Sequence, residues 1–135
     1  MNKVVEHLIN HNVKPSLQRI AIMKYLMENK NHPTVDTIYN DLLPQVPTLS
    51  RTTIYNTLKV LEGNKALITL DIDSKNLHYD GDVSPHAHFM CNKCGKIHDM
   101  PIPIESLADV PGMTNFKIED VKLYYKGICE ECNIA

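Results

Sequence analysis

Residues 84–100, SPHAHFMCNKCGKIHDM, hold three histidines, two cysteines and one aspartate, all of which are common metal ligands. Cys91 and Cys94 form one C-x2-C pair, and Cys129 and Cys132 form a second pair after 34 intervening residues. A C-x2-C turn lets both thiolates point at one ion, and four thiolates favour Zn²⁺ in a closed tetrahedron. Buried or redox-active cysteines are the alternative, but two matched pairs favour a metal. We therefore predict a structural zinc site whose binding contributes to the folding free energy.

A second group of candidate ligands consists of imidazoles and carboxylates. His86 and His88 are two residues apart, so on a strand both side chains lie on one side and can bind one ion. Asp80 precedes them, Asp99 lies on the next predicted strand, and His32 lies far away in sequence. Nitrogen and oxygen donors of this kind suit Fe²⁺ or Mn²⁺. Spacing alone leaves metal binding and ordinary packed or exposed roles open for these histidines, and it does not bring His32 to His86.

The remaining histidines are predicted not to bind metal. His98 is adjacent to Asp99, so on a strand its side chain points to the opposite face. The segment DIDSKNLHYDGD resembles a calcium loop only superficially, because Lys75 and Asn76 stand where an EF-hand needs an oxygen ligand and a glycine. The histidines set aside are His7, His11, His78 and His98.

Composition is that of a soluble globular protein, with 43% hydrophobic and 22% charged residues in 135. No apolar run is long enough to span a bilayer, and the N-terminus lacks a signal-peptide core, so we expect a cytoplasmic location without membrane contact. Residues 1–66 contain eight Lys or Arg and five Asp or Glu, a net charge of +3, whereas residues 67–135 contain six and eleven, a net charge of −5. This asymmetry indicates two units with different partners.

Hydrophobic periodicity divides the chain into a helical front half and a strand-rich back half. Four helices are predicted over residues 4–11, 16–29, 34–43 and 50–63, with Thr34 as an N-terminal cap and the last helix beginning at Ser50. Behind them we predict a hairpin over 66–82, strands over 86–91 and 96–100, a short helix over 104–110, and a long strand over 115–129. The predicted domains are therefore residues 1–82 and residues 83–135.

Four segments together resemble the ferric uptake regulator (Fur) family: NHPTVDTIYNDL, LSRTTIYNTLKVLE, HAHFMCNKCGKIHD and GICEEC. The resemblance covers nearly the whole chain in the right order. It implies an α+β fold, with an N-terminal winged-helix (helix-turn-helix) DNA-binding domain followed by a small mixed α/β dimerisation domain. It also implies a homodimeric repressor whose affinity for double-stranded DNA depends on a regulatory metal, alongside a separate four-cysteine zinc site.

Within that family the chain is most similar to the peroxide-responsive (PerR) branch. Asp99 stands where iron-sensing members usually carry glutamate, and Asp80 and Asn56 also match the peroxide branch. Val121 replaces an expected histidine, so a further metal site known in the family is expected to be absent. The resemblance implies that the regulatory Fe²⁺ or Mn²⁺ ligands are His32, Asp80, His86, His88 and Asp99. It further implies that peroxide oxidises His32 or His86.

DNA contacts are expected from the second helix of the helix-turn-helix, which enters the major groove at its N-terminal end. Arg51 can bind a phosphate or a guanine, and Asn56 can pair with adenine. The alternative is that Tyr55 is packed and Arg51 merely solvated. The resemblance adds a minor-groove lysine and a phosphate-binding arginine, and a palindromic A·T-rich operator follows from a dimer. The candidate DNA-binding residues are Lys14, Arg19, Ser50, Arg51, Thr52, Thr53, Tyr55 and Asn56.

Three other functions compete with a peroxide-sensing repressor. An iron-, manganese- or zinc-responsive repressor of the same family would lack peroxide chemistry. A small metalloenzyme would need an open ligand position, a general base and a substrate pocket, and the sequence shows no such base, so we expect no catalysis. A zinc-held scaffold would bind no operator.

Overall fold

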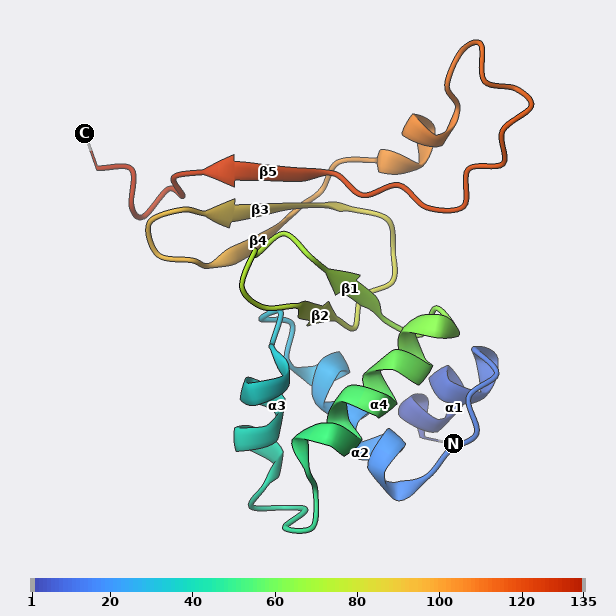
Figure 1. The fold of residues 1–135 in the computed structure, drawn as a ribbon, viewed down its shortest axis with the longest axis vertical. Coiled ribbons are helices and arrows are strands. Elements are labelled where there is room, and N and C mark those ends of the chain that lie inside the picture. Colours follow the sequence, from blue (N-terminus) through green and yellow to red (C-terminus); the bar gives the residue numbers. More distant parts are fainter. Residues whose placement is uncertain (1, 135) are drawn as a thin grey trace. The chain divides into compact units, whose positions relative to one another are not determined.

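A computed structural model describes residues 2–134 of the chain, and the chain divides into two compact units, Met1–Val83 and Ser84–Ala135. The first unit contains four helices and a hairpin (Figure 1). Its elements are α1 (Lys3–Asn10), α2 (Leu17–Glu28), α3 (Val35–Leu42), α4 (Arg51–Gly63), β1 (Ile68–Leu70) and β2 (His78–Asp80). The β1–β2 pair is the predicted wing after the helix-turn-helix, so the expected α+β winged-helix arrangement is confirmed.

Each helix of this unit begins where its sequence supplies a capping side chain. Asn2, Ser16, Thr34 and Ser50 each accept a hydrogen bond from a backbone amide in the first turn of the following helix. Such caps satisfy amides that the helix itself leaves without a partner. The predicted cap at Thr34 is therefore confirmed, and Ser50, where the fourth helix was predicted to begin, is the cap of α4.

The core of the first unit is aliphatic. Ile22, Met23, Leu26, Ile38 and Leu58 are fully buried within it. The stripe predicted on α4, Ile54, Leu58 and Leu61, is buried as expected, which leaves the opposite side of that helix exposed.

The second unit is built on a three-stranded sheet in the order β4-β3-β5. Strand β3 (Ala87–Cys91) pairs antiparallel with β4 (Ile97–Met100) and parallel with β5 (Tyr124–Gly127). A 3-10 helix, η1 (Ile104–Ala108), lies between β4 and β5 in the chain. Gly95 has a φ of 76°, which suits the tight turn that follows the first cysteine pair.

The long strand predicted over residues 115–129 is wrong in extent. Only Tyr124–Gly127 forms β5, and residues 111–120 are exposed. β5 pairs with residues His88–Cys91 of β3, which is itself only five residues long. Alternating hydrophobicity favours a strand, but a strand also needs a neighbour, and β3 provides one only over this short stretch.

Candidate metal centres and nucleic-acid interface

The four cysteines converge within the second unit. Cys91 ends β3, Cys94 follows in the turn, and Cys129 and Cys132 come directly after β5. One sulfur from each residue lies within 4.8 Å of the other three. Parallel pairing of β3 with β5 brings the two C-x2-C segments to the same end of the sheet, so sequence-distant pairs become one four-sulfur cluster.

The Cys91 sulfur lies in an environment that favours its thiolate. It accepts backbone N–H bonds from Lys93 at 3.3 Å, from Cys94 at 3.4 Å and from Cys129 at 3.4 Å. These amides, with those of Cys94 and Cys129 contributing most, lower the pKa of Cys91 to about 6. A thiolate is the form that coordinates metal, so the backbone prepares this sulfur as a ligand.

Crowding has the opposite effect on Cys132. Hydrogen bonding with Cys129 and burial raise the pKa of the Cys132 thiol to about 12. A divalent cation among the four sulfurs would remove this penalty, because it neutralises the charges that oppose one another. The donor set therefore fits Zn²⁺, whose structural sites use four thiolates.

A second convergence in the same unit joins His86, His88 and Asp99. Nε2 of His86 lies 3.1 Å from Oδ1 of Asp99, and Nε2 of His88 lies 3.3 Å from the same oxygen. The register pairs His88 with Asp99 across β3 and β4, which places their side chains on one face. His98 lies on the other face near the ring of Phe89, as its position beside Asp99 predicts. The His88 side chain is 3% exposed, so its neighbours must satisfy it.

Another pair of candidate ligands meets within the first unit. Nε2 of His32 lies 3.4 Å from Oδ2 of Asp80, and the two side chains are 4% and 1% exposed. Asp80 is the last residue of β2, and His32 lies in the loop before α3. Burial of a carboxylate beside an imidazole is costly unless hydrogen bonds or a cation compensate. Oδ1 of Asp80 also accepts the backbone N–H of Asp82 at 2.9 Å, and the pair brings together an imidazole and a carboxylate, two groups that can bind a metal.

The backbone at these two residues is tightly constrained. His32 has a φ of 55°, a left-handed conformation that costs a non-glycine residue about 1–3 kcal/mol. After Asp80 comes Gly81, where an added Cβ would lie 2.8 Å from the carbonyl oxygen of Leu26. The close approach to the end of α2 therefore requires glycine, and it fixes the point at which the chain leaves β2.

Sequence reasoning missed the residues that surround His32. His78, which was set aside, contacts the carbonyl oxygen of His32 through Nδ1 at 2.8 Å. Its Nε2 contacts Oδ2 of Asp73 at 3.0 Å. The alternation on β2 was a usable signal, because His78 lies two residues before Asp80 and so on the same side of the strand.

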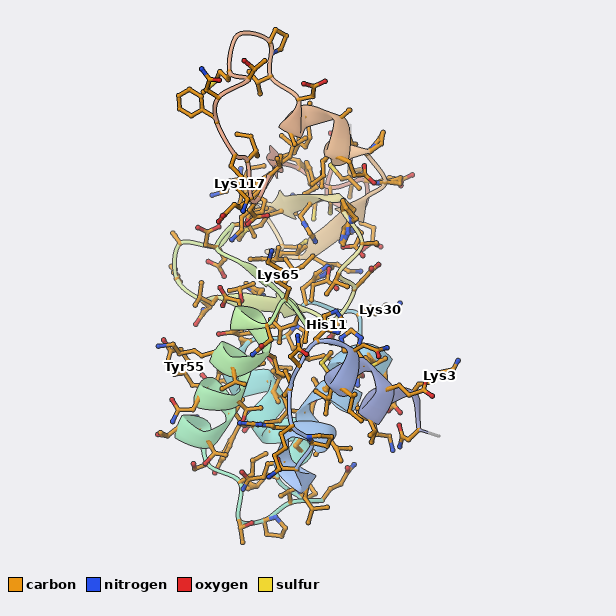
Figure 2. The ribbon with its side chains drawn as sticks, turned by 90° about the vertical axis from the view of Figure 1, so that its right-hand side faces the viewer. Lys3, His11, Lys30, Tyr55, Lys65 and Lys117 are labelled. Carbon is orange, nitrogen blue, oxygen red and sulfur yellow. The ribbon has the colours of Figure 1, made fainter. Side chains whose placement is uncertain are left out.

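The N-terminal part of α4 presents the predicted DNA-binding side chains. Thr52, Tyr55 and Asn56 are exposed, and Figure 2 shows Tyr55 pointing outward from the helix. Tyr55 is therefore not packed in the core. Thr53 and Ser50 are partly engaged in the cap, since the Ser50 hydroxyl donates to Oγ1 of Thr53 at 2.9 Å.

Arg51 is held by two residues of α3 rather than being merely solvated. Its Nε donates to Oδ1 of Asp36 at 2.7 Å, and its guanidinium lies 4.2 Å from the ring centroid of Tyr39. Both members of the ion pair are more than half exposed, so this contact orients the side chain and adds little stability.

Two further candidates, Lys14 and Arg19, lie just before α2 and in its first turn. Arg19 donates through Nη1 to the carbonyl oxygen of Lys14 at 2.9 Å. This bond fixes the turn that carries Lys14, whose side chain is exposed and available to a polyanion.

Comparison with known proteins gives a consistent result. Residues 10–126 match the model of the ferric uptake regulator family. The peroxide-responsive repressor PerR of Staphylococcus epidermidis is 36% identical over 124 residues, which are 89% of this chain and 81% of that protein.

Solved structures give the same picture. The ferric uptake regulator from Francisella tularensis with iron is 26% identical with a TM-score of 0.72, covering 90% of this chain and 95% of that one. The structure of PerR from Streptococcus pyogenes, which concerns peroxide sensing and gene regulation by that protein, is 33% identical with a TM-score of 0.53. The match covers 96% of this chain and 90% of that one. Within the described residues no helix is long and apolar enough to cross a membrane.

Proposed function

Because the chain belongs to the ferric uptake regulator family, we propose that it is a metal-dependent, peroxide-sensing transcriptional repressor, not an enzyme, that binds palindromic A·T-rich operators as a homodimer. The observation that carries this proposal is the separation of two donor sets: four sulfurs in one cluster, and imidazoles and carboxylates elsewhere. One set suits a structural ion and the other a regulatory ion.

In this proposal Cys91, Cys94, Cys129 and Cys132 hold one structural zinc per chain. The zinc ties the end of β3 to the segment after β5, and so it fixes the sheet of the second unit. Because the unfolded chain has no preformed site, the free energy of zinc binding becomes free energy of folding.

The regulatory ion is proposed to bind His32, Asp80, His86, His88 and Asp99. The set is dominated by buried imidazole and carboxylate donors, which fits Fe²⁺ or Mn²⁺. Two ligands come from the first unit and three from the second. An ion that binds all five selects the arrangement of the two units in which they meet, and in this proposal that arrangement is the DNA-binding one.

Peroxide sensing is proposed to act on the ligands themselves. An Fe²⁺ ion held by these residues would promote cleavage of the O–O bond of hydrogen peroxide without a net change in its own oxidation state, whereas Mn²⁺ would not do so readily. The net change transfers one oxygen atom from hydrogen peroxide to the imidazole ring of His32 or His86 and releases water. An oxidised ring is a poorer ligand, so the ion is lost and the arrangement it selected is no longer favoured.

DNA recognition is proposed to use the exposed side of α4. Arg51, Thr52, Tyr55 and Asn56 offer contacts to phosphates, thymine methyl groups and adenine. Ser50, Thr53, Lys14 and Arg19 complete the proposed interface at its edges. This role implies access to chromosomal DNA and hence a cytoplasmic location.

Dimerisation is proposed to use the second unit. β5 is an edge strand of the described sheet, and it lies near large apolar side chains in the sequence that are at least 39% exposed. Open edges and exposed apolar surface of this kind are usually covered by a partner. The residues concerned are Met113, Phe116, Tyr125 and Ile128.

The deciding experiment compares Fe²⁺- and Mn²⁺-loaded protein, prepared without air, on a duplex selected from random DNA by the Mn²⁺ form. Brief, low-dose hydrogen peroxide should release the Fe²⁺ form from DNA and add one oxygen to His32 or His86, as read by peptide mass spectrometry. The Mn²⁺ form should remain bound. Unmodified histidines and persistent binding in the Fe²⁺ form would instead indicate an iron-, manganese- or zinc-responsive repressor without peroxide chemistry.

A further inference from the structure

The His78 ring contacts an acceptor at each of its two nitrogens. Nδ1 lies 2.8 Å from the carbonyl oxygen of His32, and Nε2 lies 3.0 Å from Oδ2 of Asp73. A carbonyl oxygen and an ionised carboxylate only accept hydrogen bonds. The ring therefore lies within hydrogen-bond distance of an acceptor at each end, and it links the loop that contains His32 to Asp73.

Asp73 is suited to the acceptor role. Its Oδ1 accepts the backbone N–H of Lys75 at 3.0 Å, which leaves Oδ2 for His78. The bond from His78, followed by the bond from Lys75, holds the pKa of Asp73 below its usual value, so the carboxyl is ionised. The side chains of His78 and Asp73 are only 14% and 18% exposed, so water competes little with their bond.

A second hydrogen bond joins the loop that contains His32 and Pro33 to β2. The backbone N–H of Tyr79 donates to the carbonyl oxygen of Pro33 at 3.0 Å. Two consecutive carbonyls, those of His32 and Pro33, are thus held by two consecutive residues of β2. Between them they fix the peptide that follows the left-handed φ of 55° at His32.

We propose that His78 and Asp73 are positioning residues for the regulatory metal site, because they hold the His32 backbone so that its Nε2 faces Asp80. The same strand carries both functions, since His78 begins β2 and the proposed ligand Asp80 ends it. The bonds that hold this backbone, from His78 to His32 and from Tyr79 to Pro33, join protein groups only. This inference rests on the proposed function, because it concerns the same regulatory site.

The first test measures Mn²⁺ affinity of zinc-loaded, full-length protein by the electron paramagnetic resonance signal of free Mn²⁺. His78→Gln offers a donor to only one of the two acceptors and should weaken Mn²⁺ binding about 10- to 100-fold, the loss typical when a residue that orients a ligand is removed. His78→Arg, which has several donors and no acceptor, should restore affinity to within about three-fold of wild type. Equal affinity of His78→Gln and wild type would overturn the proposal.

His11→Gln is the matched control. His11 also bonds a histidine carbonyl through Nδ1, that of His7, at 2.7 Å (Figure 2 labels His11). It lies just beyond α1, and its contacts do not include His32 or Asp80. The same substitution there should leave Mn²⁺ affinity unchanged, and a loss equal to that of His78→Gln would contradict a specific role for His78.

The second test needs no regulatory metal. Hydrogen exchange of the Tyr79 amide is followed in protein that carries zinc but no Mn²⁺. It should be faster in His78→Gln than in wild type or His11→Gln, because the Tyr79–Pro33 bond is no longer supported by the adjacent bond between His78 and His32. Zinc content should be equal in all three proteins. Unchanged exchange would show that His78 does not hold the loop. If wild type itself fails to bind Mn²⁺, the proposed function falls, while the exchange result still decides whether His78 anchors His32.

Discussion

The four cysteines all belong to one unit of the chain, whereas the histidines and aspartates of the second candidate set are divided between the two units. All four sulfurs come from Ser84–Ala135 and lie within 4.8 Å of one another. His32 and Asp80 come from Met1–Val83, whereas His86, His88 and Asp99 come from the other unit. In the proposed function, the four cysteines hold a structural ion within one unit, whereas the regulatory ion takes ligands from both units.

Breaking the sulfur cluster should have the largest effect. Cys94→Ser removes one of four ligands, and structural zinc sites contribute about 10–16 kcal/mol in apparent binding free energy at neutral pH. We expect loss of zinc by metal analysis, together with loss of the dimer by sedimentation. A folded, dimeric, zinc-free Cys94→Ser protein would contradict the structural role of the cluster.

Removing one ligand of the proposed regulatory site should leave the fold intact. His88→Ala removes an imidazole that meets Asp99 at 3.3 Å. Mn²⁺ affinity should fall by more than about 100-fold, because loss of a direct ligand exceeds the effect of losing a residue that only supports one. Zinc content and melting temperature without Mn²⁺ should remain near wild type, and Mn²⁺-dependent DNA binding should disappear. Retained Mn²⁺-dependent binding would remove His88 from the site.

The backbone position directly after Asp80, which is Gly81, can be tested separately from the proposed ligands. Gly81→Ala would place a Cβ 2.8 Å from the carbonyl oxygen and 2.9 Å from the carbonyl carbon of Leu26, so backbone must shift. We expect a loss of about 1–3 kcal/mol in the free energy of unfolding, measured with urea, and weaker Mn²⁺ binding. Gly63→Ala is the control, because nothing lies within 4 Å of its Cβ and it is helical. That change should be neutral or stabilising by up to about 1 kcal/mol.

The smallest effect is expected at the surface ion pair on the DNA-binding side. Asp36→Asn frees Arg51 from a carboxylate 2.7 Å away without altering the core. Stability should change by less than about 1 kcal/mol, since exposed pairs contribute little. Non-specific DNA should bind a few-fold more tightly, with a steeper salt dependence, because one more cation is available to phosphates. Glu6→Gln on α1 makes the same charge change away from α4, and an equal gain there would indicate net charge alone.

Much of the fold could be predicted because its signals are local. Caps at Thr34 and Ser50, the apolar stripe of α4 and the two cysteine pairs are each written within a few residues. The orientation of His98 away from Asp99 likewise followed from strand alternation.

What could not be predicted depends on distant residues. The bond from His78 to His32 joins positions 46 residues apart, and strand alternation places His78 on the side of Asp80 without indicating that His32 lies there. The extent of β5 depends on the length of its neighbour β3, and the contacts of Arg51 depend on how α3 lies against α4. In each case the sequence specifies a side chain, but its partner is set by packing.

The parallel pairing of β3 with β5 also has a consequence for the time course of folding. Cys91 and Cys94 are adjacent in the chain and can meet an ion early, but Cys129 and Cys132 arrive only after a long loop closes. Loop closure costs entropy, and contacts of high sequence separation form slowly compared with local helices. We expect the first unit to fold while the second unit is still unfolded. Zinc delivered to the first cysteine pair would then act as a nucleus on which the second pair is captured, so zinc supply would set the rate at which functional protein accumulates.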